Sequence, residues 1–211
     1  MTPHRMHTER AIGWRAAQAL GRLLTTLLFD LKVYGLENVP ARGGVLLVSN
    51  HQSNLDPVLL GVRLKRPLHY IAKSELFDGR IGGWLLRSTF NAFPVRQGAG
   101  DDAAVREAIA RLREGHLLNL YPEGARSADG AIGPMQRGVG VIARRARVPI
   151  IPVVIDGSFG AWPRHRRCFR PRPIRIRYCQ PMDLNGQSPD QIVATIDHIL
   201  RQMFASLRDG R

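Results

Sequence analysis

The 211-residue sequence has few cysteines and no long apolar run. Its two cysteines, Cys168 and Cys179, form no CxxC pair and have no paired histidine, which argues against a zinc knuckle or a disulfide framework. No apolar segment approaches the roughly 20 residues that a membrane-spanning helix needs. With 44% hydrophobic and 23% charged residues, the chain has room for one compact domain, or two very small ones, and is neither disordered nor collagen-like in composition.

Lysine is also scarce, although the chain is strongly basic. Only three of the 31 Lys and Arg residues are lysines, and the formal net charge is +14. Arginine stays charged and binds phosphate through two parallel hydrogen bonds. The composition therefore indicates an anionic partner, such as a lipid headgroup, a nucleotide, nucleic acid or an acidic carrier protein, and does not choose among them.

The most apolar stretch, residues 11–31, has the spacing of an amphipathic helix. Its apolar residues recur at helical intervals, with Arg15, Gln18, Arg22 and Thr25 on another face. The apolar positions are Ile12, Ala16, Leu20, Leu23, Leu24, Leu27 and Leu31. Two interpretations stay open: a helix lying in a membrane interface, and a helix packed on the domain. Interrupting arginines and the lack of a small-residue cleavage site disfavour a secretory signal.

From residue 43 onward, strand-like and helix-like segments alternate. We expect strands at 43–49, 67–72, 92–95, 117–121 and 149–155, an edge strand at 174–178, and helices at 101–113 and 139–145. A last helix begins with a capping box, in which Ser188 and Gln191 satisfy each other's backbone N–H groups. This order predicts a single α/β domain, with a mixed, mostly parallel sheet flanked by helices, over residues 36–211, preceded by the N-terminal amphipathic segment 1–35.

The loop after the first of these strands carries a histidine followed five positions later by an aspartate. Asp56 can hold the His51 ring in one tautomer and stabilise the imidazolium that forms on proton uptake. Such a pair is a general base with its orienting group, and its substrate must bring the hydroxyl. A structural alternative is that Asp56, directly before Pro57, caps a helix.

The loop after the fourth predicted strand combines a glycine with charged residues. Arg126, Ser127 and the backbone N–H groups around Gly124 can hold a phosphate. Arg96, after the third predicted strand, can reach the same mouth. The alternative is a surface pair between Glu123 and Arg126, worth less than about 1 kcal/mol.

Four blocks in this order resemble the 1-acylglycerol-3-phosphate acyltransferase family and its glycerolipid acyltransferase relatives. The blocks are Asn50-His51-Gln52-Ser53-Asn54-Leu55-Asp56, Phe93-Pro94-Val95-Arg96, Tyr121-Pro122-Glu123-Gly124-Ala125-Arg126-Ser127 and Ile150-Ile151-Pro152-Val153-Val154. In the third block, Tyr121 stands where the family has phenylalanine and Ala125 where it has threonine. The resemblance covers residues 50–155.

The resemblance implies acyl transfer from a thioester, acyl-CoA or acyl carrier protein, to the free hydroxyl of a lysophospholipid. The typical acceptor is 1-acyl-glycerol-3-phosphate, which gives phosphatidic acid. His51 would act as the base and Asp56 would orient it, without an acyl-enzyme. The substrate-binding residues would be Arg96, Glu123, Gly124, Arg126 and Ser127, with Glu123 orienting Arg126 or binding a glycerol hydroxyl. We expect no metal and no cofactor besides the thioester donor.

The resemblance also implies a location and leaves alternatives. An enzyme with lipid substrates is expected to sit peripherally or monotopically on the cytoplasmic face of the cell membrane, against anionic lipid. Related enzymes act on another lysolipid or a non-glycerol lipid. Two alternatives of other classes are a non-catalytic lipid-binding relative and a nucleic-acid-binding module at the arginine cluster 164–177, although we expect no nucleic-acid partner.

Overall fold

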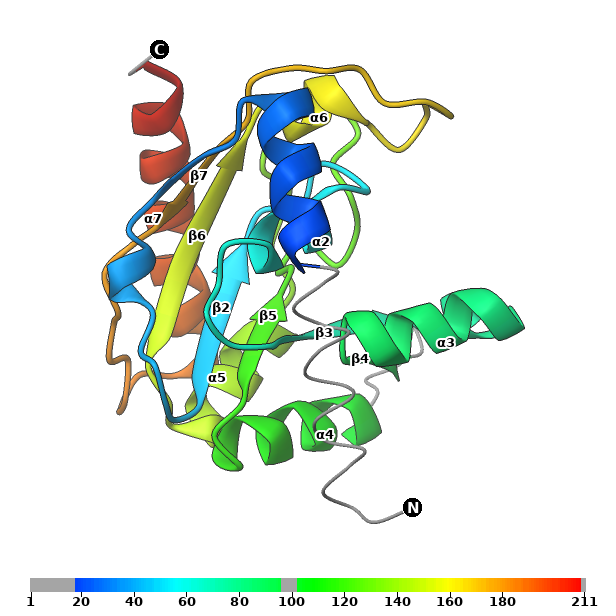
Figure 1. Cartoon of the computed structure of the whole chain (residues 1–211). Coiled ribbons are helices and arrows are strands. Elements are labelled where there is room, and N and C mark those ends of the chain that lie inside the picture. The colour runs from blue at the N-terminus through cyan, green and yellow to red at the C-terminus, as the bar shows by residue number, and fades with distance from the viewer. Residues whose placement is uncertain (1–17, 96–101, 210–211) are drawn as a thin grey trace.

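A seven-stranded sheet organises the molecule (Figure 1). The computed structural model describes residues 18–95 and 102–209. The strand order is β1-β7-β6-β2-β5-β3-β4, and all neighbouring pairs are parallel except β6 and β7. The strands are β1 (Lys32–Tyr34), β2 (Val45–Ser49), β3 (Leu68–Lys73), β4 (Ala92–Val95), β5 (Leu117–Leu120), β6 (Ile150–Asp156) and β7 (Arg175–Tyr178). The predicted α/β domain with a mostly parallel sheet is confirmed.

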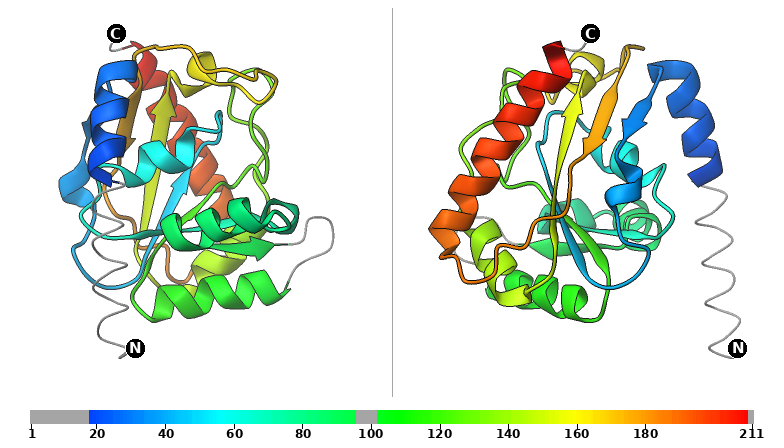
Figure 2. Two further views of the ribbon diagram at one scale, coloured as in Figure 1. Left: turned by 45° about the vertical axis from the view of Figure 1, so that its right-hand side comes forward. Right: turned by 90° about the vertical axis from the view of Figure 1, so that its left-hand side faces the viewer.

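Helices cover both faces of this sheet, so its central strands are buried on both sides. The helices are α2 (Asp56–Gly61), α3 (Arg80–Thr89), α4 (Asp102–Arg113), α5 (Gly138–Ala146), α6 (Ser158–Ala161) and α7 (Pro189–Asp209), with 3-10 turns η1 (Leu36–Asn38) and η2 (Ser74–Phe77). Residues 18–29 form a further, N-terminal helix. One apolar core joins α4, α5 and α7 to the sheet, and the other joins the N-terminal helix and α2 to its opposite face (Figure 2).

Most predicted elements are present, and the capping box of α7 is confirmed. The N–H of Ser188 donates to Gln191 Oε1 at 2.8 Å, and the N–H of Gln191 donates to Ser188 Oγ at 3.2 Å. The prediction of an edge strand at 174–178 is wrong, because β1 pairs with β7 and takes the edge position. Strand β1 has only three residues, too few for an alternating pattern to be recognised, and it comes directly after the N-terminal helix.

The N-terminal helix turns most of its leucines away from the domain. Its polar face makes the contacts: Gln18 donates to the Leu64 carbonyl at 2.6 Å, and Arg22 donates to the Val62 carbonyl at 2.8 Å. The exposed leucines are Leu20 (57%), Leu23 (56%), Leu24 (45%) and Leu27 (72%). The end of the helix enters the core, where Phe29 is buried and Leu28 packs against the cluster. Ile12, Trp14, Arg15 and Ala16 lie outside the described residues.

This orientation differs from that of α7, whose apolar stripe faces the sheet. None of the helices in the described part of the chain combines the length and the apolar character that crossing a bilayer requires.

Candidate active site

The chemistry-bearing loops meet at the carboxyl edge of the sheet. Strands β2, β5 and β6 are adjacent and parallel, so the loops that follow them open on the same side. His51 comes two residues after β2, and Tyr121 comes directly after β5. The first and third sequence blocks thereby come into contact. The N–H of His51 donates to Glu123, which is 72 residues away in the sequence.

The predicted His–Asp pair is formed. The Nδ1 atom of His51 lies 2.8 Å from Oδ2 of Asp56, and the Asp56 side chain is fully buried while that of His51 is 17% exposed. The same oxygen accepts the backbone N–H groups of Gln52 at 2.7 Å and Ser53 at 2.8 Å. The hydrogen-bond partners of Asp56 precede α2, and no side chain caps this helix. Asp56 therefore does not act as a helix cap.

Backbone contacts hold the His51 loop in place. The carboxamide of Asn50 donates to the Ile155 carbonyl at 2.9 Å and accepts the Ile155 N–H at 2.8 Å, which ties the loop to β6. The N–H of His51 donates to Glu123 Oε1 at 2.7 Å, and its carbonyl accepts the N–H of Ser127, also at 2.7 Å. Both backbone groups of His51 are therefore held by the third sequence block.

Glu123 is placed differently from the sequence-based expectation that it orients Arg126. Its second oxygen, Oε2, accepts the N–H of Gly133 at 2.8 Å, so both carboxylate oxygens bind backbone N–H groups. Burial raises the pKa of Glu123, and these two N–H donors act against that rise. Buried N–H groups need an acceptor. The Glu123 carboxylate is the acceptor for two loops, through the N–H of His51 and the N–H of Gly133.

The other predicted binding residues differ in what they contact. Arg126 donates to Oδ1 of Asn54, a residue of the His51 loop. The hydroxyl of Ser127 is used within its own loop, because it donates to Asp129 Oδ1 and accepts the N–H of Gly130. Gly124 closes a turn with a φ of 69°, a left-handed conformation that glycine adopts without strain. Arg96 lies outside the described residues.

Tyr121 has a place in the site that the sequence did not predict. Its ring stacks on the His51 imidazole, with centroids 3.8 Å apart and planes 15° apart. Burial raises the pKa of Tyr121, and its hydroxyl has no hydrogen-bond partner among the described residues. The sequence feature that could have indicated this role is the tyrosine at a position where the family has phenylalanine.

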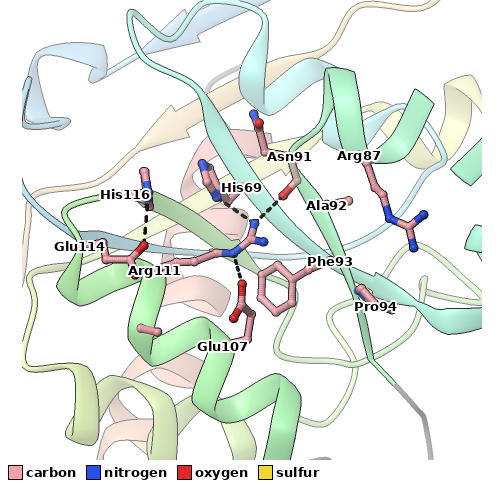
Figure 3. Close-up of a pocket in the computed structure, with 11 residues that line it drawn as sticks. His69, Arg87, Asn91, Ala92, Phe93, Pro94, Glu107, Arg111, Glu114 and His116 are labelled. Carbon is pink, nitrogen blue, oxygen red and sulfur yellow. Dashed lines mark hydrogen bonds and ion pairs between the residues drawn. The ribbon is translucent and has the colours of Figure 1, made fainter. Parts of the chain in front are cut away.

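A second group of histidines lies at the opposite edge of the sheet (Figure 3). There a cavity of about 500 Å³ is lined by His69 at the start of β3, by His116 directly before β5 and by Arg111 of α4. Nη1 of Arg111 donates to Nδ1 of His69 at 3.0 Å, and Nε of Arg111 pairs with Glu107 at 2.6 Å. Burial, followed by the charges of His116, Arg111 and Arg66, lowers the pKa of His69 to about 4.

The described residues contain no cluster typical of a metal site. Within the described ranges, no three or more histidine, cysteine or carboxylate side chains come together as metal ligands do.

The comparisons with known proteins agree with this geometry. A family model described as Acyltransferase matches residues 30–156. The chain is 31% identical over 137 residues to 1-acyl-sn-glycerol-3-phosphate acyltransferase from Bacillus subtilis (strain 168), covering 64% of this chain and 67% of that protein. It is 30% identical over 189 residues to 1-acyl-sn-glycerol-3-phosphate acyltransferase alpha from Homo sapiens, covering 86% of this chain and 66% of that protein.

A solved structure is similar over nearly the whole chain. The crystal structure of the 1-acyl-sn-glycerophosphate (LPA) acyltransferase PlsC from Thermotoga maritima superimposes with a TM-score of 0.81 at 28% identity, covering 96% of this chain and 83% of that one. The matched segments span about two thirds of the length of the curated relatives.

Proposed function

The chain belongs to the acyltransferase family, and we propose that it transfers a fatty acyl group from a thioester to the free hydroxyl of 1-acyl-glycerol-3-phosphate, giving phosphatidic acid. Relatives that carry the names of such enzymes support the acceptor. The observation that carries the chemistry is the 2.8 Å contact between His51 Nδ1 and the fully buried Asp56 carboxylate. It leaves Nε2 of the imidazole as the atom that meets the substrate.

The proposed reaction needs no covalent enzyme intermediate. The acceptor oxygen attacks the thioester carbonyl carbon while His51 Nε2 takes the hydroxyl proton. Asp56 stabilises the imidazolium, as a carboxylate does beside a catalytic histidine. The tetrahedral intermediate then breaks its C–S bond, and the leaving thiolate takes from His51 the proton that came from the acceptor hydroxyl. Only the acyl donor, acyl-CoA or acyl carrier protein, is required as a second substrate.

We propose that the phosphate of the acceptor binds on the positively charged side of the same site, at Arg126. Arg126 is bound to Asn54 in the His51 loop, which brings its guanidinium close to the base. Arg96 and the N–H groups around Gly124 complete this proposed clamp. Glu123 acts as a positioning residue, because its carboxylate fixes the backbone of His51, and Ser127 fixes the carbonyl of the same residue.

The outward leucines of the N-terminal helix support attachment to a membrane surface. An apolar face directed to water on a helix anchored by its polar face is the arrangement of an interfacial helix. We propose that segment 1–35 binds the cytoplasmic face of the membrane and presents residues 36–211, the acyltransferase domain, to lipid. Basic residues near anionic lipid add about 1 kcal/mol each. Lipid and thioester phosphates account for the arginines without a nucleic-acid partner.

Product analysis tests the function. Purified protein is incubated with a panel of lysolipids and non-glycerol lipid alcohols and with either acyl-CoA or acyl carrier protein, and the products are identified by mass spectrometry. We expect phosphatidic acid from 1-acyl-glycerol-3-phosphate with at least one donor. Acylation of another acceptor alone would replace the proposed substrate, and no acylation at all would leave lipid binding as the function.

Vesicle sedimentation tests the attachment. Changing Leu23, Leu24 and Leu27 together to serine should release the protein from anionic vesicles, because about 0.8 kcal/mol of transfer free energy is lost per methylene removed from the apolar phase. The same three positions changed to methionine are the matched control and should keep the protein bound. Equal sedimentation of both triple variants would place the attachment elsewhere.

A further inference from the structure

A second cavity of about 500 Å³ lies next to the His51 loop, at the carboxyl edge of the sheet. The end of β6, the start of β7, α6 and the last turns of α7 surround it, and these elements gather at one end of the molecule (Figure 1). Gln52, the residue after His51, forms part of its wall and donates to the Gly130 carbonyl on the other side. The cavity therefore begins one residue away from the proposed base.

Three arginines line this cavity. The side chain of Arg172 lies flat on Gly160, where a Cβ would be 3.1 Å from its Nη1 atom, and Arg208 lies over the Phe204 ring at 5.4 Å. Arg175 is half-buried, and its buried Nη1 atom has no hydrogen-bond partner among the described residues. An unpaired buried N–H is costly, so the guanidinium of Arg175 gains from an added negative charge at the cavity wall.

The carboxylates of the cavity balance only part of these charges. Asp129 is already an acceptor for the Ser127 hydroxyl and the N–H of Ala131. Asp156 is buried opposite Arg175 in the β6–β7 ladder. Two carboxylates against three guanidiniums leave the cavity with a net positive charge. Its chemistry fits a phosphate group.

We propose that this cavity binds the phosphate of the 4′-phosphopantetheine arm of the acyl donor. The inference rests on the proposed function, in which two phosphate-bearing substrates must be bound at once. Because like charges cannot share one site without repulsion, the donor needs cations separate from the acceptor's. The phosphopantetheine phosphate is common to acyl-CoA and acyl carrier protein, so the cavity serves either donor.

The rest of the arm has a path from this phosphate to the base. Phe159, Pro173 and Phe204 supply apolar surface in the same cavity, whose wall includes Gln52. A volume of about 500 Å³ lies within the usual range for small-ligand sites. An arm laid across this surface directs its thioester past Gln52 toward the imidazole of His51.

Exposed arginines extend the same positive surface away from the cavity. They stand on the segment between α6 and β7, and they are Arg164, Arg166, Arg167 and Arg170. These side chains face the remaining negative charge of the donor, which is the nucleotide phosphates of coenzyme A or the acidic surface of a carrier protein.

Direct binding tests the cavity without requiring catalysis. Calorimetry compares 4′-phosphopantetheine with pantetheine, which lacks the phosphate, on the wild-type protein and on the double variant Arg172→Gln/Arg208→Gln. Both arginines are exposed at the cavity mouth, so the fold should tolerate the changes. Loss of charged hydrogen bonds should weaken 4′-phosphopantetheine at least about 10-fold and leave pantetheine unchanged. The matched pair of changes Arg42→Gln/Arg144→Gln, which also removes two exposed arginines, is the control for net charge.

Kinetics test the same cavity during turnover. In the double variant, KM should rise for acyl-CoA and for acylated acyl carrier protein. It should stay constant for acyl-pantetheine and for the lysophospholipid. Arg167→Gln shows which acyl donor the exposed arginines bind. It should raise the KM of that donor, acyl-CoA or acylated carrier protein, without changing the affinity for 4′-phosphopantetheine.

The outcomes separate this proposal from the proposed function. If the double variant binds 4′-phosphopantetheine as the wild type does, or raises KM for the lysophospholipid instead, the cavity is not the donor site although acyl transfer stands. If the wild type transfers no acyl group, the proposed function fails, and binding of 4′-phosphopantetheine that is lost in the double variant still establishes the phosphate site. A melting curve excludes unfolding of the double variant as the cause.

Discussion

Two histidines at opposite edges of the sheet have partners of opposite charge. Nδ1 of His51 meets the Asp56 carboxylate, which only accepts hydrogen bonds, whereas Nδ1 of His69 accepts a hydrogen bond from Arg111, which only donates. His51 can therefore gain a proton beside a negative charge, whereas His69 would gain one beside a positive charge. The partner, rather than the residue type, decides which imidazole is suited to base catalysis.

Cavity size does not make this distinction. A cavity of about 500 Å³ lies beside each histidine, one lined by His69 and the other by Gln52 next to His51. Both imidazoles also stack on another ring, with centroids 3.8 Å apart for His51 and Tyr121 and 4.5 Å apart for His69 and His116. The two edges differ in the carboxylate beside an imidazole: Asp56 is fully buried at 2.8 Å from His51, whereas Glu114 is exposed and lies 3.6 Å from His116. The following predictions test the buried pair.

Removing the base should give the largest effect. His51→Ala should lower the rate of acyl transfer by up to about 10⁴-fold, which is the upper range for general-base catalysis, and leave the fold intact. The rate is measured with saturating lysophospholipid and thioester, and circular dichroism checks the fold. His69→Gln is the matched control at the other edge and should keep the wild-type rate. Full activity of His51→Ala would overturn the assignment of the base.

Removing the charge beside the base should have a smaller effect. Asp56→Asn keeps the size of the side chain and an oxygen for the loop N–H groups, but it no longer stabilises the imidazolium. We expect kcat to fall roughly 10²-fold with little change in KM for the lysophospholipid. A lower melting temperature with an unchanged kcat would instead show that the carboxylate serves only to hold the loop.

The parts of the site that could be predicted are those whose partners are close in sequence. His51 and Asp56 are five residues apart, so their contact follows from a single turn. The contact between the His51 N–H and Glu123 joins residues 72 apart and uses a backbone group, which leaves no signal in the side-chain pattern. A carboxylate that holds a loop cannot be told from one that binds substrate by residue type.

The same limit applies to the fold. Alternating strands and helices predicted the sheet, because buried parallel strands are continuous apolar runs. Amphipathic spacing predicted the N-terminal helix, but the spacing alone does not say which face is turned to the protein. Its orientation became visible only from the hydrogen bonds of Gln18 and Arg22 to the domain.

The low pKa of His69 predicts a pH dependence of stability. The unfolded chain binds a proton near pH 6.5, whereas folded His69, with a pKa of about 4, does not. The free energy of unfolding should therefore fall as the pH drops from about 6.5 to about 4. Because the ring is only partly buried, we expect about 1–2 kcal/mol in total.

Two variants isolate this contribution. His69→Gln retains an acceptor for Arg111 and should lose this part of the slope in urea unfolding measured at several pH values. His198→Gln, which removes an exposed histidine of α7, should keep it. Identical slopes in the two variants would mean that His69 takes up its proton in the folded protein as well.

The smallest expected effect concerns the ring on which His51 stacks. Tyr121→Phe removes a buried hydroxyl that has no hydrogen-bond partner among the described residues, and it installs the phenylalanine typical of the family. The free energy of unfolding should rise by about 1 kcal/mol, because an unsatisfied polar group is no longer buried. Since the ring remains to support the imidazole, kcat should stay within about 3-fold of the wild type. A fall of 10-fold or more in kcat, measured beside the unfolding curves, would mean that the Tyr121 hydroxyl contacts substrate and adds to the difference between His51 and His69.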